Sequence, residues 1–315
     1  MSSLADTLPA GFHARGATEA DAPIVVDLAN VASLHDVGDV ALDLDDVLTD
    51  WASPTLDLAV DAVMVLDGER PVAFAQIDEE RADVDVHPDV RGRGIGMALV
   101  RWTEQRARER AVGESTVRIG QTVLDGLPGI DGLFAARGYE KLWDSWILRL
   151  PDDVVLPPDA RALPPSVVVR GYEPDDEHAV YEIIDAAFSE WPGRESRPFD
   201  DWQRHTTRRS LFDPGLLVVA TADDAVVGAA IGLQYETESF VDQVAVAPAH
   251  RDRGIARALL ATLFDIFHER GERTIRLNTD SRTGALGLYL DIGMVIERTY
   301  CRWSRELTVG DASIG

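Results

Sequence analysis

Two copies of one short segment, each rich in arginine and glycine, provide the residues best suited to chemistry. The first reads VHPDVRGRGIGMAL over residues 86–99, and the second reads VAPAHRDRGIARAL over residues 246–259. In each copy a hydrophobic strand end, a proline, two arginines and a glycine precede a stretch of helical character. A turn of this kind leaves several backbone N–H groups unpaired at the positive end of a helix dipole. The two segments therefore predict two binding sites for a diphosphate group.

The context of the two segments is also repeated. Thr116-Val117-Arg118-Ile119 follows the first predicted helix, and Thr274-Ile275-Arg276-Leu277 follows the second. Between the copies, residues 151–165 contain five prolines without any periodicity, which is typical of a semi-extended linker. We therefore expect two domains, at residues 1–150 and 166–310, joined by that linker.

Each half alternates predicted strands and helices. In the first half, residues 62–66 and 71–77 form a predicted hairpin around the Asp67-Gly68 turn, followed by a strand at 81–86 and the loop. The second half repeats this order with strands at 216–221, 225–234 and 240–246. A front half rich in strands indicates an α+β (mixed α/β) fold, with a mixed, mostly antiparallel sheet flanked by helices in each domain.

The composition restricts the class of partner. The formal net charge of −25, from 55 acidic and 30 basic residues, disfavours binding to a nucleic acid. Such a charge attracts a cationic amine, and a role in solubility alone is the alternative. Cys301 is the only cysteine, and no H-E-x-x-H pattern occurs, so no metal site is expected. The sequence shows neither a signal peptide nor a membrane-spanning apolar run, so we expect a soluble cytoplasmic protein.

The loop pattern R-x-x-G-x-G/A after a short hydrophobic strand resembles the acetyl-CoA pyrophosphate loop of the GNAT superfamily of N-acetyltransferases. Two copies in one chain resemble the tandem GNAT architecture known from mycothiol synthase, and the resemblance covers nearly the whole chain. It implies two GNAT acyl-CoA N-acyltransferase domains with acetyl-CoA as the cofactor. The implied cofactor contacts in the first half are Val84, Asp85, Val86, Arg91, Gly92, Arg93, Gly94, Ile95 and Gly96. Those in the second half are Val244, Ala245, Val246, Arg251, Asp252, Arg253, Gly254, Ile255 and Ala256.

The resemblance also implies a catalytic acid. Members of the family carry a tyrosine in a helix, four residues before a glycine, that protonates the departing thiolate. Tyr289 stands four residues before Gly293, whereas the first half has Phe134 four residues before Gly138. Because phenylalanine cannot donate a proton, catalysis is expected in the C-terminal half. The N-terminal half is then expected to bind cofactor or to have a structural role.

A general base is expected on the strand that enters the second loop. A period of two places Glu238, Phe240, Asp242 and Val244 on one face of that strand. Asp242, or Glu238 acting through a water molecule, is the candidate base. The mycothiol synthase pattern has a glutamate where this chain has Phe240, which counts against that substrate.

Other polar side chains near the second loop have less certain roles. The family tends to have an asparagine at the position of Arg282, so Arg282 is a candidate contact to a cofactor phosphate or a solvated side chain. Asn278, on the next strand, is the alternative polar contact. By analogy with the fold, Glu190, Trp191 and His205 are candidate contacts to the acceptor, with surface or packing roles as the alternative.

The predicted function is transfer of an acetyl group from acetyl-CoA to a primary amine of a small molecule, by direct attack and without a covalent enzyme intermediate. Two alternatives stay open. One is mycothiol synthase, which acetylates a cysteinyl amino-sugar thiol precursor, and the other is a non-catalytic acyl-CoA-binding module. The sequence leaves open the acceptor, the acyl chain length, and whether the protein is a monomer with pseudo-dimeric halves or a homodimer.

Overall fold

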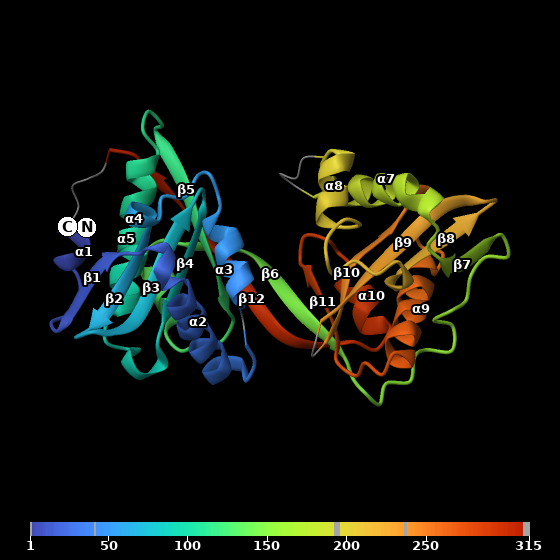
Figure 1. Ribbon diagram of the computed structural model, residues 1–315, viewed down its shortest axis with the longest axis horizontal. Helices are drawn as coiled ribbons and strands as arrows, with labels where there is room; N and C mark the ends of the chain where they lie inside the picture. Colours follow the sequence, from blue (N-terminus) through green and yellow to red (C-terminus); the bar gives the residue numbers. More distant parts are fainter. Residues whose placement is uncertain (1, 41, 192–195, 236–237, 311–315) are drawn as a thin grey trace. The chain divides into compact units, whose positions relative to one another are not determined.

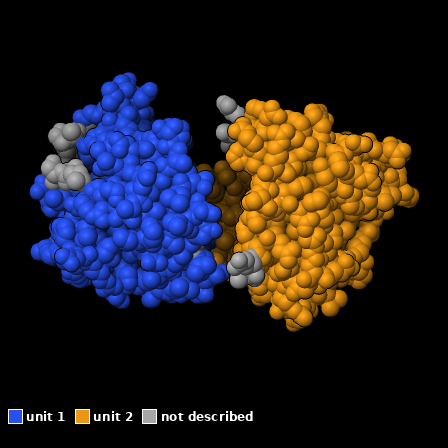
Figure 2. Space-filling model, in the orientation of Figure 1, with its two compact units in different colours: residues 1–142, 300–315 blue, residues 143–299 orange. Residues whose placement is uncertain are grey.

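The protein, seen here in a computed structural model, forms two compact units (Figures 1 and 2). The structure describes residues 2–40, 42–191, 196–235 and 238–310. One unit contains residues 1–142 together with 300–315, and the other contains residues 143–299. We call them the N-terminal unit and the C-terminal unit. This composition differs from the division at residues 150 and 166 that the sequence suggested.

The sheet of the N-terminal unit is mixed and mostly antiparallel, as expected. Among the strand pairings described for this unit, that of β4 with β5 is parallel and the others are antiparallel. Residues 300–308 of β12 pair with β5. The strand order is β1 (Phe12–Gly16), β2 (Ala62–Asp67), β3 (Arg70–Asp78), β4 (Arg81–Val86), β5 (Thr116–Leu124) and β12 (Val295–Thr308).

Helices cover both faces of this sheet because its central strands alternate between two cores. Val63 and Val65 of β2 pack in one core with α5, whereas Met64 packs in another with α2 and α3. The helices are α1 (Ser2–Ala5), α2 (Ala22–Val37), α3 (Leu44–Trp51), α4 (Leu58–Asp61), α5 (Ile95–Arg110) and α6 (Ile130–Ala136).

The C-terminal unit repeats this arrangement. Its strands run in the order β6 (Glu140–Leu150), β11 (Ile275–Asp280), β10 (Ser239–Val246), β9 (Ala225–Gln234), β8 (Leu217–Ala222) and β7 (Val167–Gly171). The β10–β11 pair is parallel. Helices α9 (Ile255–Glu269) and α10 (Leu286–Asp291) pack on one face, and α7 (Glu177–Phe188) and α8 (Phe199–His205) pack on the other.

In each unit, the strand that pairs next to the two parallel strands comes from the other half of the sequence. Residues 145–150 of β6 pair with β11 of the C-terminal unit, and residues 300–308 of β12 pair with β5 of the N-terminal unit. The domain bounds expected from the sequence put residues 143–150 in the first half, whereas the structure places them in the C-terminal unit. Residues 145–150 and 300–308 lie far along the chain from the strands they pair with, so local pattern does not show which sheet each completes.

The proline-rich segment at 151–165 is packed rather than free. Ala160 is fully buried in the core of the C-terminal unit, with Leu163 packed against the same core. Asp159 pairs with Arg257 at 3.0 Å, and Arg161 pairs with Asp265 at 2.7 Å. Both partners belong to α9, so the segment lies along the helix that follows the second loop.

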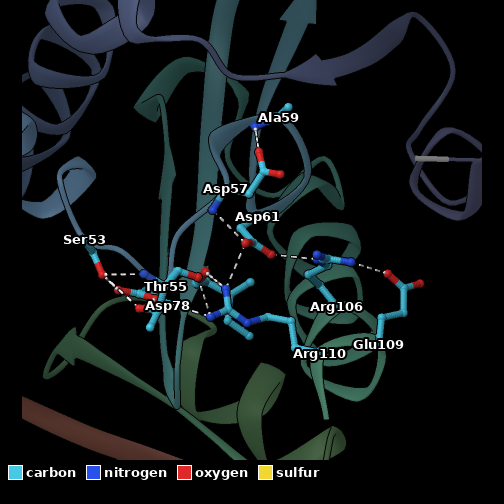
Figure 3. Close-up of polar contacts among 10 residues, drawn as sticks. Ser53, Thr55, Asp57, Ala59, Asp61, Asp78, Arg106, Glu109 and Arg110 are labelled. Atoms are coloured by element: carbon cyan, nitrogen blue, oxygen red, sulfur yellow. Dashed lines mark hydrogen bonds and ion pairs between the residues drawn. The ribbon is translucent and has the colours of Figure 1, made fainter. Parts of the chain in front are cut away.

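A polar network fixes the C-terminal part of α5 in the N-terminal unit (Figure 3). Asp61 is buried and pairs with Arg106 at 2.7 Å and with Arg110 at 2.9 Å. Arg110 also contacts Asp78, which accepts a hydrogen bond from the Thr55 hydroxyl at 2.6 Å. A buried carboxylate requires such partners, and here they connect α5 to the segment between α3 and α4.

Candidate functional site

The two loops have the same backbone conformation. Each has a 3-10 turn, at 88–90 or 248–250, and then two residues with positive φ before the helix begins. These residues are Gly92 and Gly94, with φ of 75° and 91°, and Asp252 and Gly254, with φ of 61° and 80°. No side chain caps α5 or α9 at Gly94 or Gly254. The N–H groups of the first helical turn are therefore available to an anion.

The first arginine of each loop is held by protein groups. Arg251 donates through Nε to the carbonyl of Val246 at 3.0 Å, and its two Nη atoms bind Glu190 at 2.8 and 2.9 Å. This pairing lowers the pKa of Glu190 below its usual value. Arg91 binds Asp36 in the same way at 2.6 and 2.9 Å. Each arginine thus connects its loop to the end of the helix on the opposite face of the sheet. In the C-terminal unit, Glu190 is the carboxylate that binds the loop arginine.

The second arginine of each loop is exposed. The guanidinium of Arg93 lies over the ring of Phe12, 4.5 Å from its centroid. Arg253 lies on the exposed side of its loop. Ile95 and Ile255 are buried in the cores, so only their backbone N–H groups face the loop. Of the two arginines in the second loop, Arg253 is therefore the one placed to neutralise an anion.

The parallel strands of the C-terminal unit separate at one point. Pairing of β10 with β11 runs from Ser239 opposite Ile275 to Val241 opposite Leu277, and it stops there. Residues 244–246 continue to pair with β9 on their other side. The fork leaves the backbone groups of Val244 to Val246 that face β11 without a strand partner. Contact of these residues with the cofactor stays a prediction.

A β-bulge lies at the start of the fork. The register of β10 against β9 shifts between Val241 and Gln243, so Asp242 is the extra residue. Val241 and Val244 consequently contact the same core, although a strict period of two would place them on opposite faces. The expected common face of residues 238, 240, 242 and 244 was therefore wrong. The side chain of Asp242 accepts a hydrogen bond from Gln243 Nε2 at 2.8 Å.

The N-terminal unit has no such bulge in β4. Six residue pairs run without a shift from Asp78 opposite Arg81 to Ala73 opposite Val86. Burial, together with repulsion from Asp83, raises the pKa of Asp85 on β4 to about 6. The position of Asp85 corresponds to Ala245 in the second repeat. The two units therefore differ in shape and charge where their strands enter the loops.

The helices after the parallel strands also differ. Tyr289 lies in α10, 7% exposed, within the core that contains α9. Burial raises the pKa of its phenol to about 12, so it is protonated near neutral pH. Phe134 occupies the matching place in α6, where its ring lies 5.0 Å from Tyr139 and 5.5 Å from Trp303. The N-terminal unit therefore has a purely apolar side chain at this position.

The other acidic candidate in the C-terminal unit is engaged in an ion-pair group. Glu238 pairs with Arg276 at 2.6 Å, and Arg276 also binds Glu297 at 2.7 Å. The hydrogen bonds to these two carboxylates raise the pKa of Arg276 despite its burial. Glu238 thus has a cationic partner, whereas the partner of Asp242 among the described residues is a neutral amide donor. Asp242 is the better placed of the two to accept a proton.

Two polar side chains of β11 and its following loop have defined partners. Arg282 binds Asp280 through Nε and Nη2 at 3.2 and 2.5 Å and lies over the ring of Trp143 at 4.0 Å. Asn278 is exposed and accepts a hydrogen bond from the Ser145 hydroxyl at 3.2 Å. Sequence reasoning missed Ser145 and Gln243. Gln243 follows the candidate base directly, but nothing local connects Ser145 to Asn278, 133 residues away.

The remaining candidates contact protein groups. His205 is exposed, and its Nδ1 lies 2.7 Å from the carbonyl oxygen of Asp201. Trp191 packs on Phe188 with ring centroids 4.7 Å apart. Among the described residues, no group of three or more His, Cys, Asp or Glu side chains could hold a metal ion. None of the helices in the described ranges has both the length and the apolar character needed to cross a membrane.

Comparisons with known proteins agree with this architecture. The chain is 28% identical over 259 residues to a mycothiol acetyltransferase of Thermobispora bispora, covering 78% of this chain and 81% of that protein. It is 30% identical over 255 residues to a mycothiol acetyltransferase of Frankia casuarinae, covering 74% of this chain and 71% of the relative.

Solved structures show the same fold. A GCN5-related N-acetyltransferase from Sphaerobacter thermophilus superposes with a TM-score of 0.77 at 31% identity, covering 96% of this chain and 98% of that one. A tandem GNAT protein from the clavulanic acid biosynthesis pathway superposes with a TM-score of 0.67 at 17% identity, covering 96% and 100%. The model of the acetyltransferase (GNAT) family matches residues 32–130 and 177–294. The chain therefore belongs to the GNAT family, contains two copies of its domain and is an acetyltransferase.

Proposed function

We propose that the C-terminal unit transfers the acetyl group of acetyl-CoA to a primary amine of a small molecule. The observation that carries this proposal is the difference between the units at the fork. The C-terminal unit combines Tyr289 with a bulge at Asp242, whereas the N-terminal unit has Phe134 and an unshifted β4. We infer that the N-terminal unit binds coenzyme A, or stabilises the protein, without turnover.

The loop residues fit a coenzyme A diphosphate. Gly254 begins α9 without a side-chain cap, and the exposed Arg253 lies beside it. The N–H groups of Ile255 and Ala256 would bind the phosphate oxygens, and Arg253 would neutralise their charge. The free backbone edge of Val244 to Val246 would bind the amides of the pantetheine arm, as a neighbouring strand would.

The reaction needs no covalent enzyme intermediate. Asp242 accepts a proton from the substrate ammonium, and the neutral nitrogen attacks the thioester carbonyl carbon. The C–S bond then breaks and coenzyme A leaves as a thiolate. The nitrogen loses its second proton as it becomes an amide, and that proton restores the thiol. An ordinary thiol has a pKa near 8.5, whereas the pKa of the Tyr289 phenol is about 12. The phenol is therefore the weaker acid, so it stabilises the thiolate mainly by a hydrogen bond, and proton transfer follows.

A second candidate function follows from the names of the relatives. Proteins 28% and 30% identical to this chain are mycothiol acetyltransferases, so acetylation of a cysteinyl amino-sugar thiol is the specific alternative. Phe240 lies where the mycothiol synthase pattern has a glutamate, and this difference favours another acceptor. Turnover of such a thiol far above that of simple amines would decide for the alternative.

The test compares matched variants in the two units. We expect Tyr289→Phe to lower kcat by about 10- to 1000-fold while the Kd for acetyl-CoA stays unchanged. Phe134→Leu, at the matching position, should leave kcat unchanged. The assay follows release of the free thiol of coenzyme A with a panel of amines. A loss of affinity equal to the loss of rate would make Tyr289 a binding residue. Coenzyme A binding without turnover of any amine would show a non-catalytic module.

A further inference from the structure

We propose that Asn278, oriented by Ser145, selects acceptors that carry a hydroxyl or carbonyl oxygen on the carbon next to the one bearing the amine. The inference rests on the proposed function of the C-terminal unit. It names a substrate class and adds Ser145, a residue from the first half of the sequence, to that site.

The fork places Asn278 beside the proposed base. Val241 and Leu277 form the last pair of β10 and β11, and Asp242 and Asn278 are the next residues on the two strands. Leu277 packs in the core with α9, so Asn278 projects from the opposite face of the sheet. Val241 packs in that same core, so Asp242 turns away from α9 as well. The carboxylate and the amide therefore flank the point where the thioester would lie.

Ser145 determines which end of the amide faces the site. Its hydroxyl donates to Asn278 Oδ1 at 3.2 Å, so the Nδ2 group is directed away from β6. The side chain of Asn278 is exposed, and Nδ2 has no hydrogen-bond partner in the part of the chain that the structure describes. Asn278 thus presents a donor to the acceptor side of the fork, next to a carboxylate that binds an ammonium group.

The N-terminal unit has a cation beside its parallel pair of strands. Gly120 follows the segment 116–119 as Asn278 follows 274–277 in sequence, but Gly120 still pairs with Arg81 of β4, whereas Asn278 lies beyond the last pair of β10 and β11. A Cβ atom at Gly120 would lie 2.7 Å from Arg302 Nη2, so the guanidinium covers this glycine. Arg302 donates to the carbonyl of Glu80 at 3.3 Å and to the Thr122 hydroxyl at 3.4 Å. This arrangement excludes an ammonium group by charge and by volume.

The two groups of the C-terminal unit define the acceptor chemically. The ammonium of the substrate binds Asp242 and gives up its proton there. An oxygen on the adjacent carbon accepts a hydrogen bond from Asn278 Nδ2. Asp242 and Asn278 come directly after Val241 and Leu277, the last pair, where neighbouring strands are about 4.8 Å apart, so one small substrate can contact both groups. A 1,2-amino alcohol and an α-amino carbonyl compound both meet this requirement.

The experiment compares amines that differ only in this oxygen. The probes are 2-aminocyclohexanol with cyclohexylamine, and ethanolamine with propylamine, assayed by release of the coenzyme A thiol. The wild type should prefer the oxygenated partner by about 10- to 100-fold in kcat/KM, because a bound acceptor displaces water from Asn278 Nδ2 and only the oxygenated partner replaces that hydrogen bond. Asn278→Ala and Asn278→Asp should both reduce this preference to below about threefold. The KM for acetyl-CoA should not change in either variant.

Ser145→Ala tests the orienting role. It should reduce the preference by about 3- to 10-fold, and adding it to Asn278→Ala should have no further effect. Arg302→Ala is the matched variant of the N-terminal unit and should keep the wild-type preference. Wild-type turnover with equal kcat/KM for both members of each pair would overturn the inference but leave the proposed function intact. Selectivity that responds to Arg302→Ala and not to Asn278→Ala would place the acceptor in the other unit. Absence of turnover with every amine would overturn both proposals.

Discussion

The carboxylate of Glu190, just beyond the end of α7, binds both Nη atoms of Arg251 in the second loop at 2.8 and 2.9 Å. The Nε of the same arginine holds the carbonyl of Val246, the last residue of β10. One side chain therefore fixes the loop to both its strand and the helix on the opposite face. The loop is positioned by a contact that lies outside the repeated sequence motif.

We expect Glu190→Gln to raise the KM for acetyl-CoA by about 3- to 10-fold, because a partly exposed pair contributes little more than 1 kcal/mol. The effect should shrink at high salt. Asp36→Asn, which removes the matching carboxylate of the N-terminal unit, should leave turnover unchanged. Tighter binding of acetyl-CoA by Glu190→Gln would show instead that Glu190 competes with the phosphate groups for Arg251.

Gly254→Ala should impair the second loop. The residue has φ of 80°, and a Cβ atom would lie 2.9 Å from the carbonyl oxygen of Ala162. Strain of about 1–2 kcal/mol should raise the Kd for coenzyme A in the C-terminal unit by at least about tenfold. Gly94→Ala has similar backbone strain but a contact of only 3.5 Å, to Pro9. If Gly94→Ala alone abolished turnover, catalysis would belong to the N-terminal unit.

Each unit contains a strand from the other half of the sequence, β6 or β12. We therefore expect a substitution in one of these strands to destabilise the unit whose sheet it completes. Leu150 of β6 is 1% exposed in the core of the C-terminal unit, and Leu307 of β12 is 1% exposed in that of the N-terminal unit. A buried aspartate at either position should cost about 3–5 kcal/mol. In hydrogen exchange, Leu150→Asp should reduce protection in β8 to β11, and Leu307→Asp in β2 to β5. If Leu150→Asp instead reduced protection in the N-terminal unit and Leu307→Asp in the C-terminal unit, this assignment of the two strands would be wrong.

The ion pair of Arg15 with Asp21, at the start of α2, predicts that the stability of the N-terminal unit depends on pH. Arg15 binds Asp21 at 2.6 Å and, with hydrogen bonds from Thr18, lowers the pKa of Asp21 to about 2. A depressed carboxyl pKa stabilises the fold above about pH 4, and this contribution disappears as the pH falls from about 4 to 2. Asp21→Asn should lower the free energy of unfolding by about 1–2 kcal/mol at pH 7, with the difference disappearing near pH 2. Chemical denaturation across this range measures it, and a constant difference would exclude the pair as the cause.

Several features could be read from the sequence because they depend on local pattern. The two loops, their positive-φ glycines and the helices that follow arise from proline, glycine and apolar periodicity within about 14 residues. The difference between Tyr289 and Phe134 is also a property of single positions. Local chemistry was therefore enough to predict the family, the mixed sheet and two loops with the same backbone.

The tertiary structure decided what depends on distant residues. The partners of Arg251 and Asn278 are 61 and 133 residues away, and the strand next to β11 comes from the first half of the sequence. The bulge at Asp242 is visible only as a register shift against β9. Backbone conformation is set largely by neighbours along the chain, whereas side-chain environment is set by whichever strands and helices pack together. For this reason the sequence alone predicted where a coenzyme would bind, and only the fold showed which protein groups contact Arg251 and Asn278.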